Sequence, residues 1–164
     1  MTIRTLLDAG ADNAVALTAP DRPAMTYAAL RRHVDSVGRQ LAGNGLGPSD
    51  RVAIVLPNGP EMASAFMAVA AYMSAAPLNP AYKESEYAFY LEDLAPKLVI
   101  VEAGSENPVR AAASALSIPL VEAVVGDNDP AGAFRLFEAE ADATPAGTNN
   151  EAPAHPRPGT TTRP

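Results

Sequence analysis

Three short, almost wholly apolar runs alternate with segments of helical periodicity, and this alternation limits the possible folds more than any other feature of the chain. The runs cover residues 51–56, 97–101 and 119–125 and are rich in β-branched side chains. The first two are typical of strands that are buried in a parallel sheet, and the third predicts a further strand. Because parallel neighbours need a crossover connection, the sequence predicts an α/β fold, a parallel sheet flanked by helices.

The segments between these runs carry apolar residues spaced three and four positions apart, as on one face of a helix. The clearest covers residues 26–44, where Thr26 can cap the amino end and Gly45 or Gly47 can supply the left-handed stop. Further helices are expected over residues 60–73, 84–94 and 106–117, a strand of small residues over 75–80, a loop over 18–23 and an additional edge strand over 14–17.

The composition changes after Val125. Prolines interrupt a stretch of Ala, Gly, Thr, Asn and acidic residues at Pro130, Pro145, Pro153, Pro156, Pro158 and Pro164. Only residues 133–141 could form a short helix, and the rest cannot bury enough apolar surface to offset the entropy lost on ordering. We therefore expect one organised domain over residues 1–125 and a mostly disordered C-terminal tail over residues 126–164.

Charge and residue usage exclude several classes of function. A formal net charge of −7 argues against nucleic acid and anionic membranes as partners. The chain has no cysteine and only two histidines, His33 and His155, so neither a thiolate nor a His-rich metal site is expected. The apolar stretch over residues 62–76 is too short to span a membrane, and no signal peptide is apparent, so the expected location is cytoplasmic.

Motifs of other chemistries fit structural roles better. Gly43, Gly45 and Gly47 follow a helix rather than a strand, so they are interpreted as a helix stop and not as a dinucleotide-binding fingerprint. His33 lies on an amphipathic helix with no evident partner for base catalysis, and we interpret it as a solvated or core-edge residue. No serine has the G-x-S-x-G setting of hydrolases. The sequence therefore identifies no catalytic residue and no metal ligand.

Several segments, taken in order, resemble the acyl-adenylate-forming enzymes, also called AMP-dependent synthetases. Residues 26–32, TYAALRR, resemble the T-Y-x-x-L helix of that family, and residues 47–58, GPSDRVAIVLPN, resemble its G-x-G-D-R-V-A-I-x-L-P-N turn and strand. Residues 66–70, 76–80, 90–93 and 97–100 continue in register, so the resemblance covers residues 3–125. Residues 76–83 and 87–91 are most similar to the oxalate–CoA ligase subgroup.

The resemblance implies part of the N-terminal domain of an ATP-dependent, AMP-forming carboxylate–CoA ligase. The whole enzyme would use ATP and Mg²⁺ to convert a small carboxylic acid to its acyl-adenylate, and CoA would then displace AMP. The family's phosphate loop, T-S-G-T-T-x-x-P-K, is resembled by Gly159, Thr160, Thr161 and Thr162, with a Pro-rich stretch where relatives have the preceding strand. We therefore expect a degenerate loop, and neither ATP binding nor ligase activity from this chain alone.

Two alternatives and one departure from the family remain. A flavodoxin-like regulatory module is disfavoured because the run at 51–56 ends in Pro57 and Asn58 rather than in an aspartate. The other alternative is a non-catalytic α/β interaction module that complements a separately encoded partner, such as the remainder of a ligase. Relatives often carry Thr or Ser where Lys83 stands, so the helix that begins at Glu84 is expected to lack its amino-terminal cap.

Overall fold

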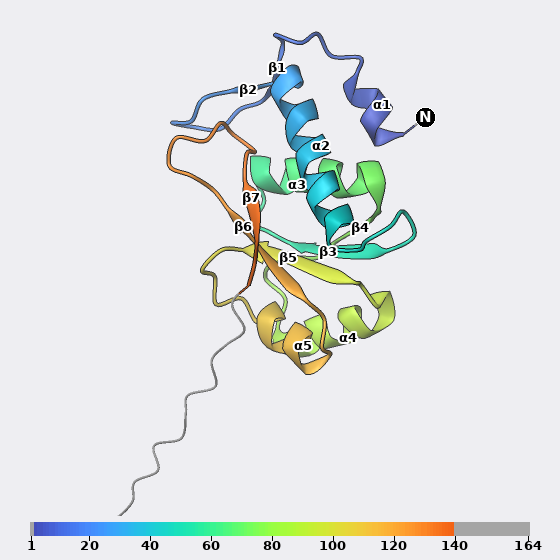
Figure 1. The fold of residues 1–164 in the computed structure, drawn as a ribbon. Coiled ribbons are helices and arrows are strands. Elements are labelled where there is room, and N and C mark those ends of the chain that lie inside the picture. The colour runs from blue at the N-terminus through green and yellow to red at the C-terminus, as the bar shows by residue number, and fades with distance from the viewer. Residues whose placement is uncertain (1, 140–164) are drawn as a thin grey trace, which may run out of the picture.

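The computed structural model describes residues 2–139 and contains a five-stranded sheet of order β4-β3-β5-β6-β7 (Figure 1). Its strands are β3 (Arg51–Val55), β4 (Ser74–Pro77), β5 (Leu98–Glu102), β6 (Leu120–Val124) and β7 (Arg135–Glu138). The first four are mutually parallel, and β7 is antiparallel to β6. The predicted α/β fold with a parallel sheet flanked by helices is confirmed, with one antiparallel strand added at an edge.

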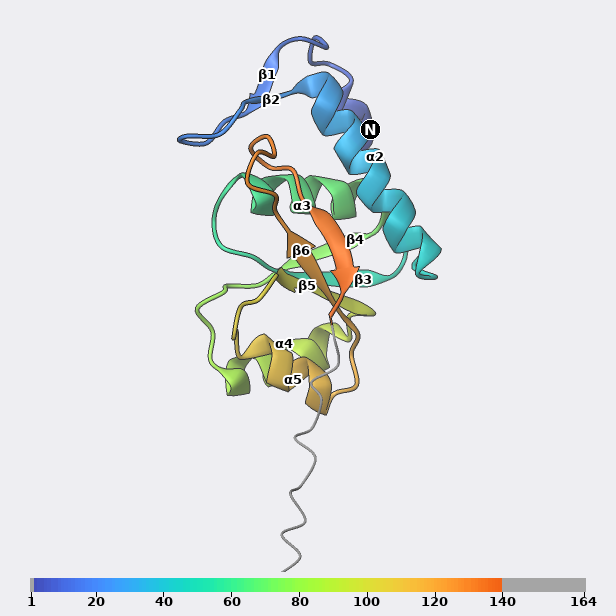
Figure 2. The ribbon, with the colours of Figure 1, turned by 60° about the vertical axis from the view of Figure 1, so that its left-hand side comes forward.

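Helices cover both faces of this sheet. They are α1 (Ile3–Leu7), α2 (Tyr27–Gly43), α3 (Pro60–Tyr72), α4 (Glu84–Leu94) and α5 (Val109–Ala115). Helices α2 and α3 lie on one face, and α4 and α5 lie on the other (Figures 1 and 2). None of the helices in the described part of the chain is long and apolar enough to cross a membrane.

The longest helix, α2, begins and ends as its sequence predicts. The hydroxyl of Thr26 accepts a hydrogen bond from the amide of Ala29 at 3.3 Å, which caps the amino end. At the other end, Gly45 has a φ of +82°, a left-handed conformation that favours glycine and stops the helix. Helix α5 is shorter than expected, because Asn107 and Pro108 form a turn before it rather than its first turn.

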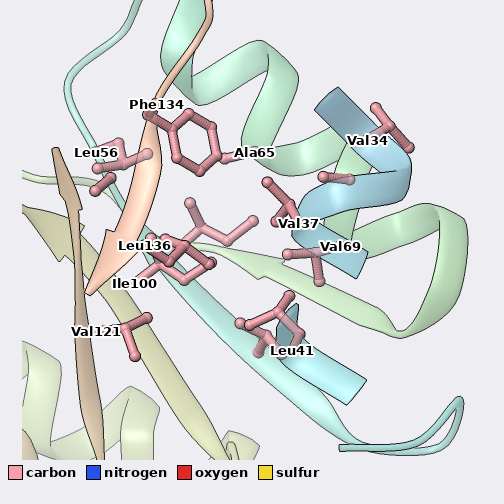
Figure 3. Packing of buried hydrophobic residues seen from close by; sticks show 14 of the residues in the cluster. Val34, Val37, Leu41, Leu56, Ala65, Val69, Ile100, Val121, Phe134 and Leu136 are labelled. Carbon is pink, nitrogen blue, oxygen red and sulfur yellow. The ribbon is translucent and has the colours of Figure 1, made fainter. Parts of the chain in front are cut away.

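Alternate residues of the central strands enter two different cores. Val52, Ile54 and Ile100 belong to the core under α2 and α3, whereas the intervening residues pack under α4 and α5. Figure 3 shows side chains from α2, α3, β5, β6 and β7 meeting in the first core. Full burial of one Val, Leu or Ile side chain stabilises a fold by roughly 1.5–3 kcal/mol. The apolar runs at residues 51–56 and 97–101 therefore mark strands β3 and β5, which are buried on both faces, as predicted, whereas β6 is fully buried on one face only.

The N-terminal edge-strand prediction was wrong in its placement. Strand β1 (Val15–Leu17) pairs with β2 (Met25–Thr26) in a separate two-stranded antiparallel sheet. Residues 18–23 form the expected loop between them. The pairing leaves the main sheet with β4 and β7 at its edges.

The helix predicted over residues 133–141 was also wrong, since residues 135–138 form strand β7. Phe134 and Leu136 are buried, at 4% exposure each, while Arg135 between them and Phe137 after them are exposed. This burial has a period of two, and it pairs the segment with β6 rather than presenting one helical face. The organised part of the chain therefore continues beyond Val125, to the end of the described residues.

Candidate functional site

The carboxyl ends of the four parallel strands meet at one edge of the sheet. From β3 the chain passes to β4 on one side and later to β5 on the other, so the direction of winding reverses beside β3. In open α/β sheets, ligands bind outside the carboxyl ends of strands at such a reversal. The loops after β3, β4, β5 and β6 are therefore the candidate site within the described residues.

The loop after β3 leads directly into α3. Leu56 is buried at the end of the strand, whereas Pro57, Asn58 and Gly59 are exposed. Pro60 occupies the first turn of α3, where its missing amide hydrogen is not needed. The exposed backbone of this loop is open to a ligand or to another part of the protein.

A junction of four residues, Arg22, Glu61, Ser64 and Gly132, fastens the loop after β6 to the start of α3. The carboxylate of Glu61 accepts hydrogen bonds from the Gly132 amide at 3.0 Å and from the Arg22 guanidinium at 2.5 Å. The buried hydroxyl of Ser64 donates to the Gly132 carbonyl at 2.6 Å. Gly132 has a φ of +85°, and a Cβ there would lie 3.0 Å from the Pro60 carbonyl oxygen, so glycine is required.

The loops after β4 and β5 are tied to each other in a similar way. The Tyr87 hydroxyl donates to the Asn79 carbonyl at 2.8 Å, and the Asn107 side-chain amide donates to the Pro80 carbonyl at 2.9 Å. Burial raises the pKa of Tyr87, which keeps its hydroxyl protonated as the donor. The candidate site thus rests on loops that are fixed by side-chain hydrogen bonds.

His33 lies close to the junction but does not face solvent as a base would. Its Nε2 atom is buried with no hydrogen-bond partner, and its ring packs edge-on against Phe134 at a centroid distance of 4.6 Å. Burial lowers the pKa of His33, while the negative charges of Asp129 and Glu61 act in the opposite direction. The interpretation of His33 as a core-edge residue is confirmed.

Phosphate chemistry needs hydrogen-bond donors, a divalent cation and a positive charge around the reacting group. The Arg22 guanidinium at this edge is already bound by Glu61. Within residues 2–139, no group of three His, Asp or Glu residues could hold a metal ion. The predicted phosphate-loop residues Gly159, Thr160, Thr161 and Thr162 lie outside the described residues.

The sequence did not reveal the junction. In the sequence Glu61 is simply an acidic residue in the first turn of α3, but its hydrogen-bond partners lie 39 and 71 residues away along the chain. A glycine flanked by alanines, as Gly132 is, carries no local signal of a long-range hydrogen bond. The predicted strand over residues 51–56 and the predicted helix over residues 60–73 are the sequence signals that could have indicated where the junction lies.

Comparisons with known proteins agree with this architecture. The AMP-binding enzyme family matches residues 8–161. The chain is 37% identical over 123 residues to an oxalate–CoA ligase of Arabidopsis thaliana, covering 69% of this chain and 24% of that protein. It is 40% identical over 106 residues to a probable CoA ligase, CCL9, of Humulus lupulus, covering 64% of this chain and 20% of that protein.

A solved structure supports the fold independently of close sequence similarity. Apo MatB from Rhodopseudomonas palustris aligns with a TM-score of 0.66 at 21% identity, covering 85% of this chain and 30% of MatB. The chain thus spans about a fifth to a third of the length of these three proteins. Because the family match takes in nearly the whole sequence, the chain belongs to the AMP-binding enzyme family.

Proposed function

We propose that this chain is part of an ATP-dependent, AMP-forming carboxylate–CoA ligase. The observation that carries the proposal is the family match over residues 8–161. The described fold agrees with it, and both sequence relatives named above are CoA ligases, one of them marked as probable. The alternative of a non-catalytic interaction module is not favoured by these relatives.

The proposed reaction has two steps. An oxygen of the acid's carboxylate attacks the α-phosphorus of ATP, releasing pyrophosphate and forming an acyl-adenylate. The sulfur of CoA then attacks the acyl carbon and its thiol proton is lost to solvent, while AMP leaves with the bonding electrons of the mixed anhydride. The first step makes a good leaving group from a carboxylate oxygen, which would otherwise have to leave as oxide.

We assign the phosphate contacts of this reaction to Gly159, Thr160, Thr161 and Thr162. Backbone amides and threonine hydroxyls are suitable donors to phosphate oxygens. The family match supports this assignment because it extends to residue 161. The Pro-rich segment before Gly159 departs from the family pattern, and for this reason we regard the loop as degenerate. Mg²⁺ and CoA are proposed as ligands of the whole ligase only.

A small acid of the oxalate type is the proposed substrate of the whole ligase. The support is the similarity of residues 76–83 and 87–91 to the oxalate–CoA ligase subgroup, together with the Arabidopsis relative. Within the described fold these residues form the end of β4, the β4–α4 loop and part of α4, and the loop belongs to the candidate site.

A chimaeric enzyme tests the proposal. Residues 3–139 of this chain would replace the matching segment of the Arabidopsis oxalate–CoA ligase, and oxalate-dependent pyrophosphate release would be measured with and without CoA. We expect turnover above that of the same ligase with the segment deleted. A soluble chimaera that releases no pyrophosphate would refute the assignment of this fold to ligase catalysis.

A further inference from the structure

The four-residue junction described above lies at the start of α3, beside the loop of residues 57–59 that follows β3. Its Glu61 is the second residue of α3. Arg22 comes from the loop between β1 and β2, and Gly132 comes from the segment between β6 and β7. Three segments that are far apart in the sequence therefore meet at one end of α3, at the edge of the sheet that forms the candidate site.

The loop of residues 57–59 has few bonds that hold it in place. In the described part of the chain, the amides of Asn58 and Gly59 donate no hydrogen bond to another backbone group, and Pro57 has no amide hydrogen. The Gly59 carbonyl accepts a hydrogen bond from the Ala63 amide at 3.1 Å, which ties the loop to the first turn of α3. At its other end the loop continues from β3, which lies between β4 and β5 in the sheet. The position of the loop therefore depends on where α3 starts.

Arg22 and Glu61 fix this start as one unit. The Glu61 carboxylate accepts hydrogen bonds from the Arg22 guanidinium at 2.5 Å and from the Gly132 amide at 3.0 Å. The same guanidinium also donates to the Pro130 carbonyl at 2.9 Å. The two charged side chains are 22% and 20% exposed, so solvent screens this ion pair less than it screens a pair on the open surface. Removing either member would leave the other charge without its partner.

We propose that Glu61 is a positioning residue for the ligase reaction, because it fixes the loop of residues 57–59 at the carboxyl edge of the sheet. The inference rests on the proposed function. Groups that bind reacting molecules must be held to within about 0.5 Å of their productive positions. A misplacement of about 1 Å, caused by a change away from the reacting atoms, can lower a rate about 100-fold. In this role Glu61 acts through the loop and does not itself contact a substrate.

The opposite end of α3 offers a matched control. There the hydroxyl of Tyr72, the last residue of the helix, donates to the Asp35 carboxylate at 2.6 Å. Asp35 also accepts a hydrogen bond from Arg4 at 2.7 Å, and its side chain is 30% exposed. Like Glu61, it is a partly buried carboxylate that binds an arginine and holds α3. It joins α3 to α1 and α2, however, and not to the loops of the candidate site.

The variants Glu61→Gln, Arg22→Lys and Asp35→Asn in the chimaera test the inference. Pyrophosphate release would be measured over ranges of ATP and oxalate concentration, and urea unfolding of the same variants in the 164-residue chain would measure their stability. We expect Glu61→Gln to lower kcat at least about tenfold and Asp35→Asn to lower it less than about twofold, at similar shifts of the urea midpoint. Arg22→Lys keeps the charge but not the whole set of hydrogen bonds, so its kcat should lie between these two.

The possible results separate this inference from the proposed function. A chimaera with native Glu61 that releases no pyrophosphate refutes the proposed function, and the positioning role falls with it. An active chimaera in which Glu61→Gln keeps more than about half of kcat overturns the positioning role alone. Equal losses of kcat for Glu61→Gln and Asp35→Asn would show that Glu61 only stabilises the fold, which also overturns it. If Glu61→Gln is insoluble, Arg22→Lys decides, because an unchanged kcat in that variant contradicts the inference and a lowered one supports it.

Discussion

Replacing Leu136 and Phe137 in turn tests whether β7 is a strand and how firmly it holds the sheet edge. Leu136 is 4% exposed and belongs to the core under α2 and α3, while its neighbour Phe137 is 52% exposed. Leu136→Ala removes three buried carbons, at about 0.8 kcal/mol each, and leaves a cavity that an edge strand can partly close. We expect a loss of about 2–3 kcal/mol in the free energy of unfolding. Phe137→Ala should change it by less than about 0.5 kcal/mol in the isolated chain.

Urea unfolding followed by far-UV circular dichroism measures both changes, since the chain has no tryptophan. For a slope of about 2 kcal/mol per molar urea, Leu136→Ala should lower the midpoint by about 1–1.5 M. Equal losses at the two positions, or a larger loss at Phe137, would refute the strand. A helix over residues 133–141 would place Phe134 and Phe137 on one buried face, and that arrangement predicts the opposite order of effects.

Four further predictions concern the helix caps, the junction, His33 and catalysis. Lys83→Thr should stabilise the chain by roughly 1 kcal/mol and raise its melting temperature. At the amino end of α4 the Lys83 amide donates a hydrogen bond to the Glu86 side chain, and a threonine hydroxyl would supply the second bond of the capping box. Gly132→Ala should cost about 1–3 kcal/mol in urea unfolding because of its positive φ, whereas Gly43→Ala, with open space around it, should not destabilise the chain. Burial lowers the pKa of His33. The contribution of this residue to stability is therefore complete above the ordinary pKa of about 6.5 and declines as the pH falls below that value. His33→Phe should reduce the loss of stability between about pH 7 and pH 5, and an unchanged pH dependence of unfolding would contradict the reasoning. The 164-residue chain alone should release no pyrophosphate from ATP with any small carboxylic acid, and turnover by a preparation free of contaminating ligase would be the contrary result.

Elements whose signals are local could be predicted from the sequence. Thr26 and Gly45 delimit α2 because a cap and a left-handed stop act within one helical turn. The runs at β3 and β5 identified the central strands because residues 52–56 and 98–101 are all buried. The resemblance to the adenylate-forming enzymes depends on these same segments.

Features that depend on distant partners could not be predicted in the same way. Residues 134–138 fit a helical or a strand pattern equally well over so short a length, and pairing with β6 decides between them. The side chain of Gln40 on α2 then donates to the Leu136 carbonyl at 2.6 Å, across 96 residues of sequence. The Glu61 junction has the same character, because its bonds exist only once the loops that carry Arg22 and Gly132 have met the start of α3.

The partly covered face of β6, by contrast, has a signal in the sequence that can be interpreted once the strand register is known. Strands β3 and β5 have no charged residue between their ends, whereas β6 carries Glu122 at its centre. Burying a carboxylate in the middle of a strand costs free energy when the face that carries it is fully covered and the charge has no partner. The presence of Glu122 therefore favours a face that is only partly covered. Glu122 points to the same face as Phe137 and is neutralised by Arg110 of the adjacent helix.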